Sequence, residues 1–261
     1  MIMTSAVILP LGLMALGVVV GPLLGVIVDR TVAREMLELE HRCTSCSHGL
    51  GRSSLIPLVS WKDRCGACGA HKGRRYPLVD LSIASTFAML GLRFGVGWML
   101  LPYLALAAVL VVLSAIDAET HLLPNIIVWP SFFAGLFIIF VISGQQDYAN
   151  GIYSALVGAA VFAGFIGAAH LVYEQGMGRG DVKLSMTLGL FLGWLQPSLI
   201  DTTRLVLATI FVALLGGGIG GLIYNTVKSR GRAEIPFGPA LAAATLVAVL
   251  ASSSVLDTVS L

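Results

Sequence analysis

Long uncharged apolar stretches alternate with short polar segments along almost the whole chain. Because an apolar helix of about 20 residues crosses the hydrocarbon of a bilayer, most of these stretches are long enough to be transmembrane helices. Two of them are shorter, and Asp80 lies inside the first of these two. The pattern predicts an all-α polytopic membrane protein with about eight transmembrane helices. The stretches are residues 6–28, 78–92, 94–116, 122–143, 148–173, 184–195, 205–227 and 235–256.

Composition supports a membrane protein. Of the 261 residues, 57% are hydrophobic and only 11% are charged, whereas a soluble domain has about 25% charged residues. The 30 glycines suit close packing between helices in lipid, and we interpret the glycine-rich run at 216–221 in that way. The net charge of +2 and the absence of interleaved aromatic and basic residues give no support for a nucleic-acid partner. Anionic lipid headgroups explain the basic residues.

The distribution of Lys and Arg predicts the orientation of the chain. With eight spans and an outside N-terminus, the inside loops are residues 29–77, 117–121, 173–183 and 228–234, and these hold fourteen of the sixteen Lys and Arg residues. Such an excess marks cytoplasmic loops. Both termini are therefore expected outside. Residues 1–28 lack the basic start and the cleavage site of a signal peptide, so we interpret them as a permanent anchor.

All four cysteines lie in the one sizeable polar segment, residues 29–77. They form two C-x2-C pairs that are separated by eighteen residues. Four thiolates in this spacing complete a tetrahedral zinc site that leaves no open position, which is typical of structural zinc. Two disulfides or buried free thiols are the alternatives, but disulfides seldom persist in the cytoplasm. The predicted zinc ligands are Cys43, Cys46, Cys65 and Cys68.

Two carboxylates stand at the ends of apolar stretches. Asp117 ends one stretch, and Asp181 precedes another, both on the expected cytoplasmic face. An ionisable side chain at membrane depth is a candidate functional group. Two carboxylates, one ionised and one protonated, can activate a water molecule against a peptide bond. Asp117 and Asp181 are therefore predicted to be a catalytic pair, the alternatives being an interfacial charge and a helix-capping carboxylate.

The residues before Asp181 are rich in glycine. Gly176, Gly178 and Gly180 permit irregular backbone and close approach, so an extended substrate could pair with this segment. Lys183 follows Asp181 by two residues, where it could bind a phosphate headgroup or tune an acid. We predict a substrate-approach loop that contains these three glycines and Lys183.

Four sequence blocks and, after them, one further segment occur in order along the chain. They are the two cysteine pairs around residues 56–61, the Arg-Tyr-Pro-Leu-Val-Asp segment at 75–80, Asp117 with residues 123–125, residues 176–184, and the Ile-Pro-Phe-Gly-Pro segment at 235–239. With these blocks the chain resembles the prepilin leader peptidases, also called type IV leader peptidases, of the G-x-G-D aspartic protease group.

The resemblance implies an aspartic endopeptidase of the bacterial cytoplasmic (inner) membrane. It would remove the basic leaders of type IV prepilins and type II secretion pseudopilins on the cytoplasmic side. Asp117 and Asp181 would then be the catalytic pair, one acting as a general base on water and the other donating a hydrogen bond to the scissile carbonyl. Many members of the family also N-methylate the new amino terminus with S-adenosylmethionine, and the cysteine module is commonly associated with that two-activity form. S-adenosylmethionine is therefore expected as a cofactor beside zinc.

The resemblance suggests three domains. Residues 1–28 are the first transmembrane helix, residues 29–77 a cytoplasmic zinc-knuckle module associated with methyl transfer, and residues 78–261 a membrane-embedded aspartic peptidase core.

Three other functions are open. An intramembrane protease of the presenilin or signal-peptide-peptidase type would share the carboxylates and glycines but not the cysteine module. An ion-coupled transporter would use the same carboxylates as proton or sodium sites, although transporters place such sites near the midplane and usually show internal repeats. A zinc-knuckle membrane scaffold would give no reason for the two carboxylates.

Overall fold

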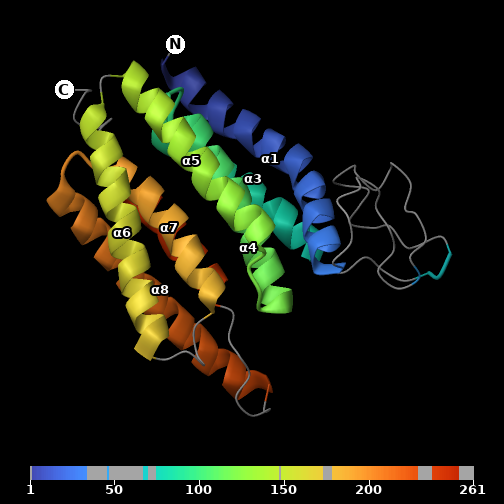
Figure 1. Ribbon diagram of the computed structural model, residues 1–261. Coiled ribbons are helices and arrows are strands. Elements are labelled where there is room, and N and C mark those ends of the chain that lie inside the picture. The colour runs from blue at the N-terminus through green and yellow to red at the C-terminus, as the bar shows by residue number, and fades with distance from the viewer. Residues whose placement is uncertain are drawn as a thin grey trace. The chain divides into compact units, whose positions relative to one another are not determined.

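The structure is a computed structural model, which describes residues 2–33, 46, 67–69, 75–146, 148–172, 178–228 and 237–252. The regular secondary structure of these residues is entirely α-helical, which confirms the predicted fold class (Figure 1). The helices are α1 (Ile2–Ala33), α3 (Arg75–Phe94), α4 (Leu100–Thr120), α5 (Asn125–Gln145), α6 (Ala149–Val172), α7 (Arg179–Trp194), α8 (Leu199–Lys228) and α9 (Gly238–Ala251).

Each predicted apolar stretch corresponds to one of these helices, but the helices differ in length. In the described part of the chain, six are long and apolar enough to cross a membrane: α1, α3, α4, α5, α6 and α8. The other two, α7 and α9, have 16 and 14 residues, which gives lengths of about 24 Å and about 21 Å at the usual helical rise. A bilayer core is about 30 Å thick. Helix length therefore supports a polytopic membrane protein with six clear spans among the described residues and does not confirm the predicted count of eight.

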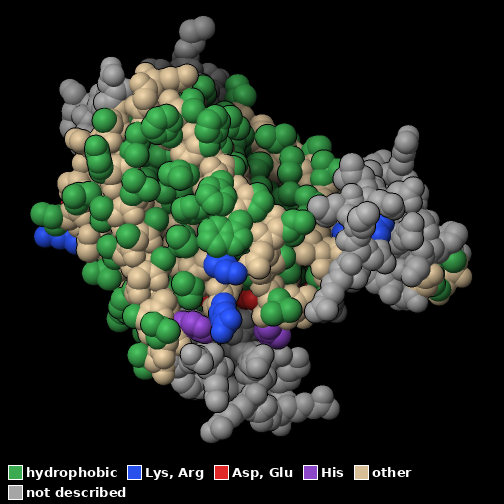
Figure 2. Space-filling view, in the orientation of Figure 1, with side chains coloured by type: hydrophobic (Ala, Val, Ile, Leu, Met, Phe, Trp, Pro, Cys, Tyr) green, Lys and Arg blue, Asp and Glu red, His purple; other side chains and the backbone are tan. Residues whose placement is uncertain are grey.

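The exposed surface of α5 fits contact with lipid. Phe133, Phe137 and Phe140 are all largely exposed, and their spacing places them on one face of the helix. Hydrophobic side chains cover much of the surface that Figure 2 shows. An apolar surface of this extent is expected where the solvent is lipid rather than water.

Residues 95–99 separate α3 from α4. The sequence predicted an apolar stretch over residues 94–116, whereas α4 begins at Leu100. Gly95 has a φ of +56°, a left-handed conformation that glycine adopts without steric cost. Its N–H donates to the Gly91 carbonyl, with N and O 3.0 Å apart, which ends α3 as a typical glycine C-cap does. The rings of Phe94 and Tyr103 then stack with centroids 4.8 Å apart.

The chain divides into two compact units, Met1–Ile116 and Asp117–Leu261. In the first unit, α1 and α3 lie side by side (Figure 1). Gly17 makes their close approach possible, because a Cβ at this position would lie 2.6 Å from the Ala84 Cα. The absence of a side chain thus allows backbone-to-backbone packing.

In the second unit, α7 is the central helix and packs against α5, α6, α8 and α9. Nearly all of its residues from Leu184 to Trp194 are buried. The closest packing is with α6, where a Cβ on Gly158 would overlap the Gly189 carbonyl oxygen. A short helix that is covered on all sides in this way is held by its neighbours more than by its own length.

Two hydrogen bonds hold the C-terminal end of α7. Trp194 Nε1 donates to Ser143 Oγ over 2.9 Å, and the Tyr148 hydroxyl donates to the Gln196 carbonyl over 2.7 Å. Burial raises the pKa of Tyr148 to about 12, so its hydroxyl remains a donor at neutral pH. These bonds connect the end of α7 to the last turn of α5 and to Tyr148, which directly precedes α6.

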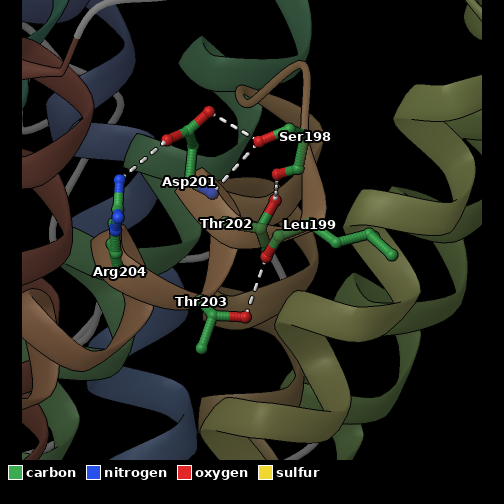
Figure 3. A network of polar contacts seen from close by, with 6 residues as sticks. All are labelled: Ser198, Leu199, Asp201, Thr202, Thr203 and Arg204. Carbon is green, nitrogen blue, oxygen red and sulfur yellow. Dashed lines mark hydrogen bonds and ion pairs between the residues drawn. The ribbon is translucent and has the colours of Figure 1, made fainter.

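The start of α8 is capped by Ser198 (Figure 3). The Asp201 N–H donates to Ser198 Oγ over 3.2 Å, and the Ser198 hydroxyl donates to Asp201 Oδ2 over 2.6 Å. Arg204 lies 3.8 Å from Asp201 Oδ1, but this ion pair is largely exposed and adds little to stability. The cap satisfies backbone N–H groups that have no partner within the helix.

Candidate active site

Asp117 lies in the last turn of α4 and is only 5% exposed. The helix ends at His121, whose φ of +53° is unusual for a residue with a side chain. The His121 N–H donates to the Asp117 carbonyl over 2.9 Å, as in a left-handed C-cap. This C-cap fixes the conformation of the backbone that carries the Asp117 side chain.

The Asp117 carboxylate is held by a residue from the far end of the chain. The Gly238 N–H donates to Asp117 Oδ2 over 2.9 Å, and the bond is buried. Gly238 is the first residue of α9 and lies 121 positions after Asp117. A helix N-terminus has free N–H groups and a positive dipole end, so it is a favourable partner for a carboxylate.

Asp181 lies in the first turn of α7 and is 6% exposed. The Gly178 N–H donates to Asp181 Oδ2 over 3.2 Å, and the Asp181 N–H donates to the Gly178 carbonyl over 3.1 Å. The carboxylate is therefore a local helix cap, one of the two roles that the sequence left open.

The structure brings the two predicted carboxylates together. Asp117 and Asp181 come from different helices and lie close enough for their charges to interact. Each is buried, and each accepts a hydrogen bond from a backbone N–H. Two neighbouring buried carboxyl groups are an arrangement that can perform general acid–base hydrolysis when one is ionised and the other protonated.

Two histidines surround this pair. His121 lies within electrostatic range of Asp117, and His170 lies within electrostatic range of Asp181. In the space-filling view, His side chains flank a small patch of Asp or Glu, with Lys or Arg side chains beside it (Figure 2). Both carboxylates are thus buried, and each has a histidine within electrostatic range.

The residues of the predicted substrate-approach loop have separate positions. Gly178 is exposed and extended, with φ −71° and ψ 145°. Gly180 is already helical, and a Cβ there would lie 2.8 Å from the Leu123 Cβ. Lys183 Nζ donates to Asn125 Oδ1 over 2.8 Å, which links α7 to the start of α5. Gly176 lies outside the described residues.

The predicted zinc site is described only in part. Cys46 and Cys68 are described and exposed, whereas Cys43 and Cys65 lie outside the described residues. Among the residues that the structure covers, no three His, Cys, Asp or Glu side chains form a group that could hold a metal ion. The zinc site therefore remains a prediction from the cysteine spacing.

Sequence reasoning did not assign Gly238 a role in the site. A backbone donor leaves no signature of its own in a sequence, since every residue except proline has an N–H. The available signal was the Ile-Pro-Phe-Gly-Pro segment at 235–239, which was noted only as part of the resemblance.

Known proteins resemble the chain in both halves. Residues 104–225 match the type IV leader peptidase family, and residues 15–94 match the bacterial peptidase A24 N-terminal domain. No solved structure matches the chain.

Curated relatives cover most of the chain, and three of them are each named prepilin leader peptidase/N-methyltransferase. The protein of Stutzerimonas stutzeri is 31% identical over 265 residues, covering 91% of this chain and 89% of the relative. The protein of Pseudomonas aeruginosa is 32% identical over 270 residues, with 90% and 88% covered. That of Aeromonas salmonicida is 34% identical over 217 residues, with 82% and 72% covered. The coverage and the order of the two family matches establish that the chain belongs to the type IV leader peptidase family.

Proposed function

We propose that this chain is an aspartic endopeptidase that cleaves the basic leader peptides of type IV prepilins and type II secretion pseudopilins. One observation carries the proposal: two buried carboxylates, Asp117 and Asp181, interact electrostatically and each accept a backbone hydrogen bond. The names of the curated relatives support prepilins as substrates, and the pseudopilins are included because the sequence resemblance implies them.

The reaction needs one ionised and one protonated carboxyl group. The ionised carboxylate accepts a proton from water as the water oxygen bonds to the scissile carbonyl carbon, and the other carboxyl donates its proton to the carbonyl oxygen. The tetrahedral diol then collapses with the roles exchanged. One carboxylate takes a hydroxyl proton, the C–N bond breaks, and the leaving nitrogen receives the other proton. Both groups return to their starting states, so the pair turns over without a further reactant.

Gly176, Gly178, Gly180 and Lys183 guide the substrate to this pair. Gly178 is the exposed, extended residue next to Asp181, so an extended leader peptide could lie against its backbone. Lys183 supports the same segment from within α7 through its bond to Asn125.

A second activity follows cleavage. The relatives' names include N-methyltransferase, and we extend this activity to the new amino terminus of the cleaved pilin, with S-adenosylmethionine as the methyl donor. Cys43, Cys46, Cys65 and Cys68 hold a structural zinc ion that stabilises residues 29–77, because four thiolates form a complete tetrahedral set.

The chain is an integral membrane protein, and we place it in the bacterial cytoplasmic membrane with both termini outside. The excess of Lys and Arg in residues 29–77, 173–183 and 228–234 supports this orientation. It requires α7 and α9 to count as two of eight membrane segments although they are short. The transporter alternative receives no support from the relatives, whose names are those of peptidases.

The decisive experiment incubates membranes that contain the full chain with a prepilin and S-adenosylmethionine, and reads the mass of the product. We expect leader loss followed by addition of a methyl group. Asp117→Asn and Asp181→Asn should each reduce cleavage by at least about 100-fold, the scale of acid–base catalysis. Normal processing by either variant, at normal accumulation in the membrane, would remove that residue from the mechanism.

The zinc ion has a separate test. Purified wild-type protein should contain one zinc ion per chain by metal analysis, and Cys43→Ser should lower that content and destabilise residues 29–77. Unchanged zinc in the variant would refute the proposed site.

A further inference from the structure

We infer that Gly238 is a positioning residue of the peptidase, and that Gly217 and Phe237 hold it in contact with Asp117. The inference rests on the proposed function of the Asp117–Asp181 pair. It assigns a role to the segment that begins α9 and to one glycine of the run in α8, neither of which has a part in the acid–base steps above.

The first observation is the bond from Gly238 to Asp117. It is buried, has an N-to-O distance of 2.9 Å, and joins residues 121 positions apart. A charged acceptor and an amide donor in a buried site make a strong hydrogen bond. This bond therefore holds the Asp117 carboxylate against the start of α9.

The second observation is that position 238 admits no side chain. A Cβ there would lie 2.7 Å from Asp117 Oδ2 and 3.3 Å from the Asp117 Cβ. Since real Cβ atoms do not approach an oxygen this closely, any larger residue would displace either the carboxylate or the start of α9. The backbone itself does not demand glycine, because Gly238 is helical and is not among the residues with positive φ.

The third observation concerns what holds Gly238 in place. Phe237, the residue before it, lies over Gly217 of α8, where a Cβ would be 3.0 Å from the Phe237 Cδ2 and Cε2 atoms. The flanking Gly216 and Gly218 have no atom within 4 Å of the equivalent position. Of these three successive glycines, Gly217 alone faces α9, so its missing side chain leaves the room that the Phe237 ring fills.

These contacts form one connected path from α8 to the catalytic pair. Gly217 accommodates Phe237, Phe237 places the Gly238 N–H, and that N–H holds the Asp117 carboxylate. None of the three residues supplies a group to the reaction steps. Their predicted effect is on the rate of the chemical step rather than on substrate binding, because displacing a catalytic group by about 1 Å can reduce the rate about 100-fold.

The test compares alanine variants of the full-length protein in proteoliposomes, with kcat and KM measured on a prepilin. We expect Gly238→Ala to lower kcat about 100-fold and to leave KM within about twofold, since the change displaces the Asp117 carboxylate and alters none of the residues proposed to guide the substrate. Gly217→Ala should lower kcat about tenfold, because its Cβ displaces Phe237 by less. Gly216→Ala and Gly218→Ala are the matched controls and should retain wild-type kcat.

A compensating change distinguishes positioning from a general loss of structure. Phe237→Leu in the Gly217→Ala background removes ring atoms at the point of conflict, so the double variant should recover most of the lost kcat. Recovery would not occur if Gly217→Ala acted by destabilising α8. This comparison also applies if Gly238→Ala fails to accumulate.

Each outcome bears on one proposal or both. Wild-type kcat in Gly238→Ala, or equal effects at Gly216, Gly217 and Gly218, would overturn the positioning role while Asp117→Asn remained inactive. Full activity of Asp117→Asn, or no prepilin cleavage by the wild type, would overturn the proposed function and this inference with it.

Discussion

Each of the two compact units contains buried carboxylates, and the contacts that surround them can be compared. In Met1–Ile116, Asp80 is 2% exposed in α3, and its side chain occupies the space left by Gly21 of α1. In Asp117–Leu261, Asp117 and Asp181 are almost as buried, but each accepts an N–H from the first residues of a helix or its cap. Burial alone therefore does not distinguish the candidate catalytic groups. Asp117 and Asp181 combine burial with donors at helix N-termini and with a second carboxylate within electrostatic range.

Removing each carboxylate tests this distinction with the largest expected effect. Asp117→Asn should reduce prepilin cleavage by at least about 100-fold, whereas Asp80→Asn should leave kcat/KM within about twofold because it removes no group of the reacting pair. Cleavage is measured with equal amounts of membrane-inserted protein. A loss of cleavage in Asp80→Asn as large as in Asp117→Asn would end the distinction between the units.

The next largest predicted effect is a loss of stability when the close packing of α6 against α7 is disturbed at a glycine. Gly158→Ala forces a Cβ into the backbone of α7, while Gly164 on the same helix has no atom within 4 Å of that position. We expect Gly158→Ala to lower the free energy of unfolding by about 3 kcal/mol, the upper range for overpacking, and Gly164→Ala to change it little. Thermal unfolding in detergent provides the measurement. Equal melting temperatures for the two variants would contradict the close α6–α7 packing.

The same comparison applies to the first unit. Gly17→Ala would place a Cβ 2.6 Å from the Ala84 Cα, while Gly12 on the same helix is unobstructed. We expect Gly17→Ala to cost about 2 kcal/mol and yet to leave the kcat of the folded protein unchanged, because the catalytic pair belongs to the other unit. Lower kcat per folded molecule in Gly17→Ala would show that the units depend on each other for catalysis.

Tyr148→Phe should cost somewhat less, because it removes the hydroxyl that donates to the Gln196 carbonyl; about 1.5 kcal/mol is expected. The bond also has a pH limit. Since the pKa of folded Tyr148 is raised to about 12 from about 10 in an unfolded chain, its contribution is complete below pH 10 and is lost as the pH rises towards 12. Unfolding of wild type and variant across pH 8 to 12 measures this. An unchanged difference over that range would contradict the assignment.

The smallest effect is expected at the start of α8. Ser198→Ala removes the hydroxyl that accepts the Asp201 N–H, and loss of such a cap costs about 1 kcal/mol. Arg204→Ala is the matched control, because the Arg204 ion pair is exposed. Thermal unfolding of both variants is the measurement, and a larger loss in Arg204→Ala than in Ser198→Ala would reverse the assignment.

The helices and the two carboxylates could be predicted because their signals are local. An uncharged apolar run has few alternatives to a helix in lipid, and a charge at its end is conspicuous. The limits of the helices were harder, since α7 begins at Arg179, before its apolar run. Polar residues in a first helical turn have no apolar signal, so the prediction began at residue 184.

Long-range packing could not be predicted in the same way. The glycine run at 216–221 was interpreted as a packing surface, and the structure confirms this at Gly217, which faces Phe237 and Ala240. Which glycine of a run faces a partner depends on the rotation of the helix about its own axis, and the run itself does not reveal it. The bond between Gly238 and Asp117 likewise depends on tertiary structure alone.

The separation between Asp117 and its donor has a consequence for biosynthesis. When a ribosome has delivered both aspartates to the bilayer, the amide that restrains the earlier one has yet to be synthesised, because it belongs to α9. A nascent chain that stops before residue 237 would insert its preceding helices without an ordered pair of acids. The Asp117 carboxylate would thus reach its final position only after α9 has been synthesised.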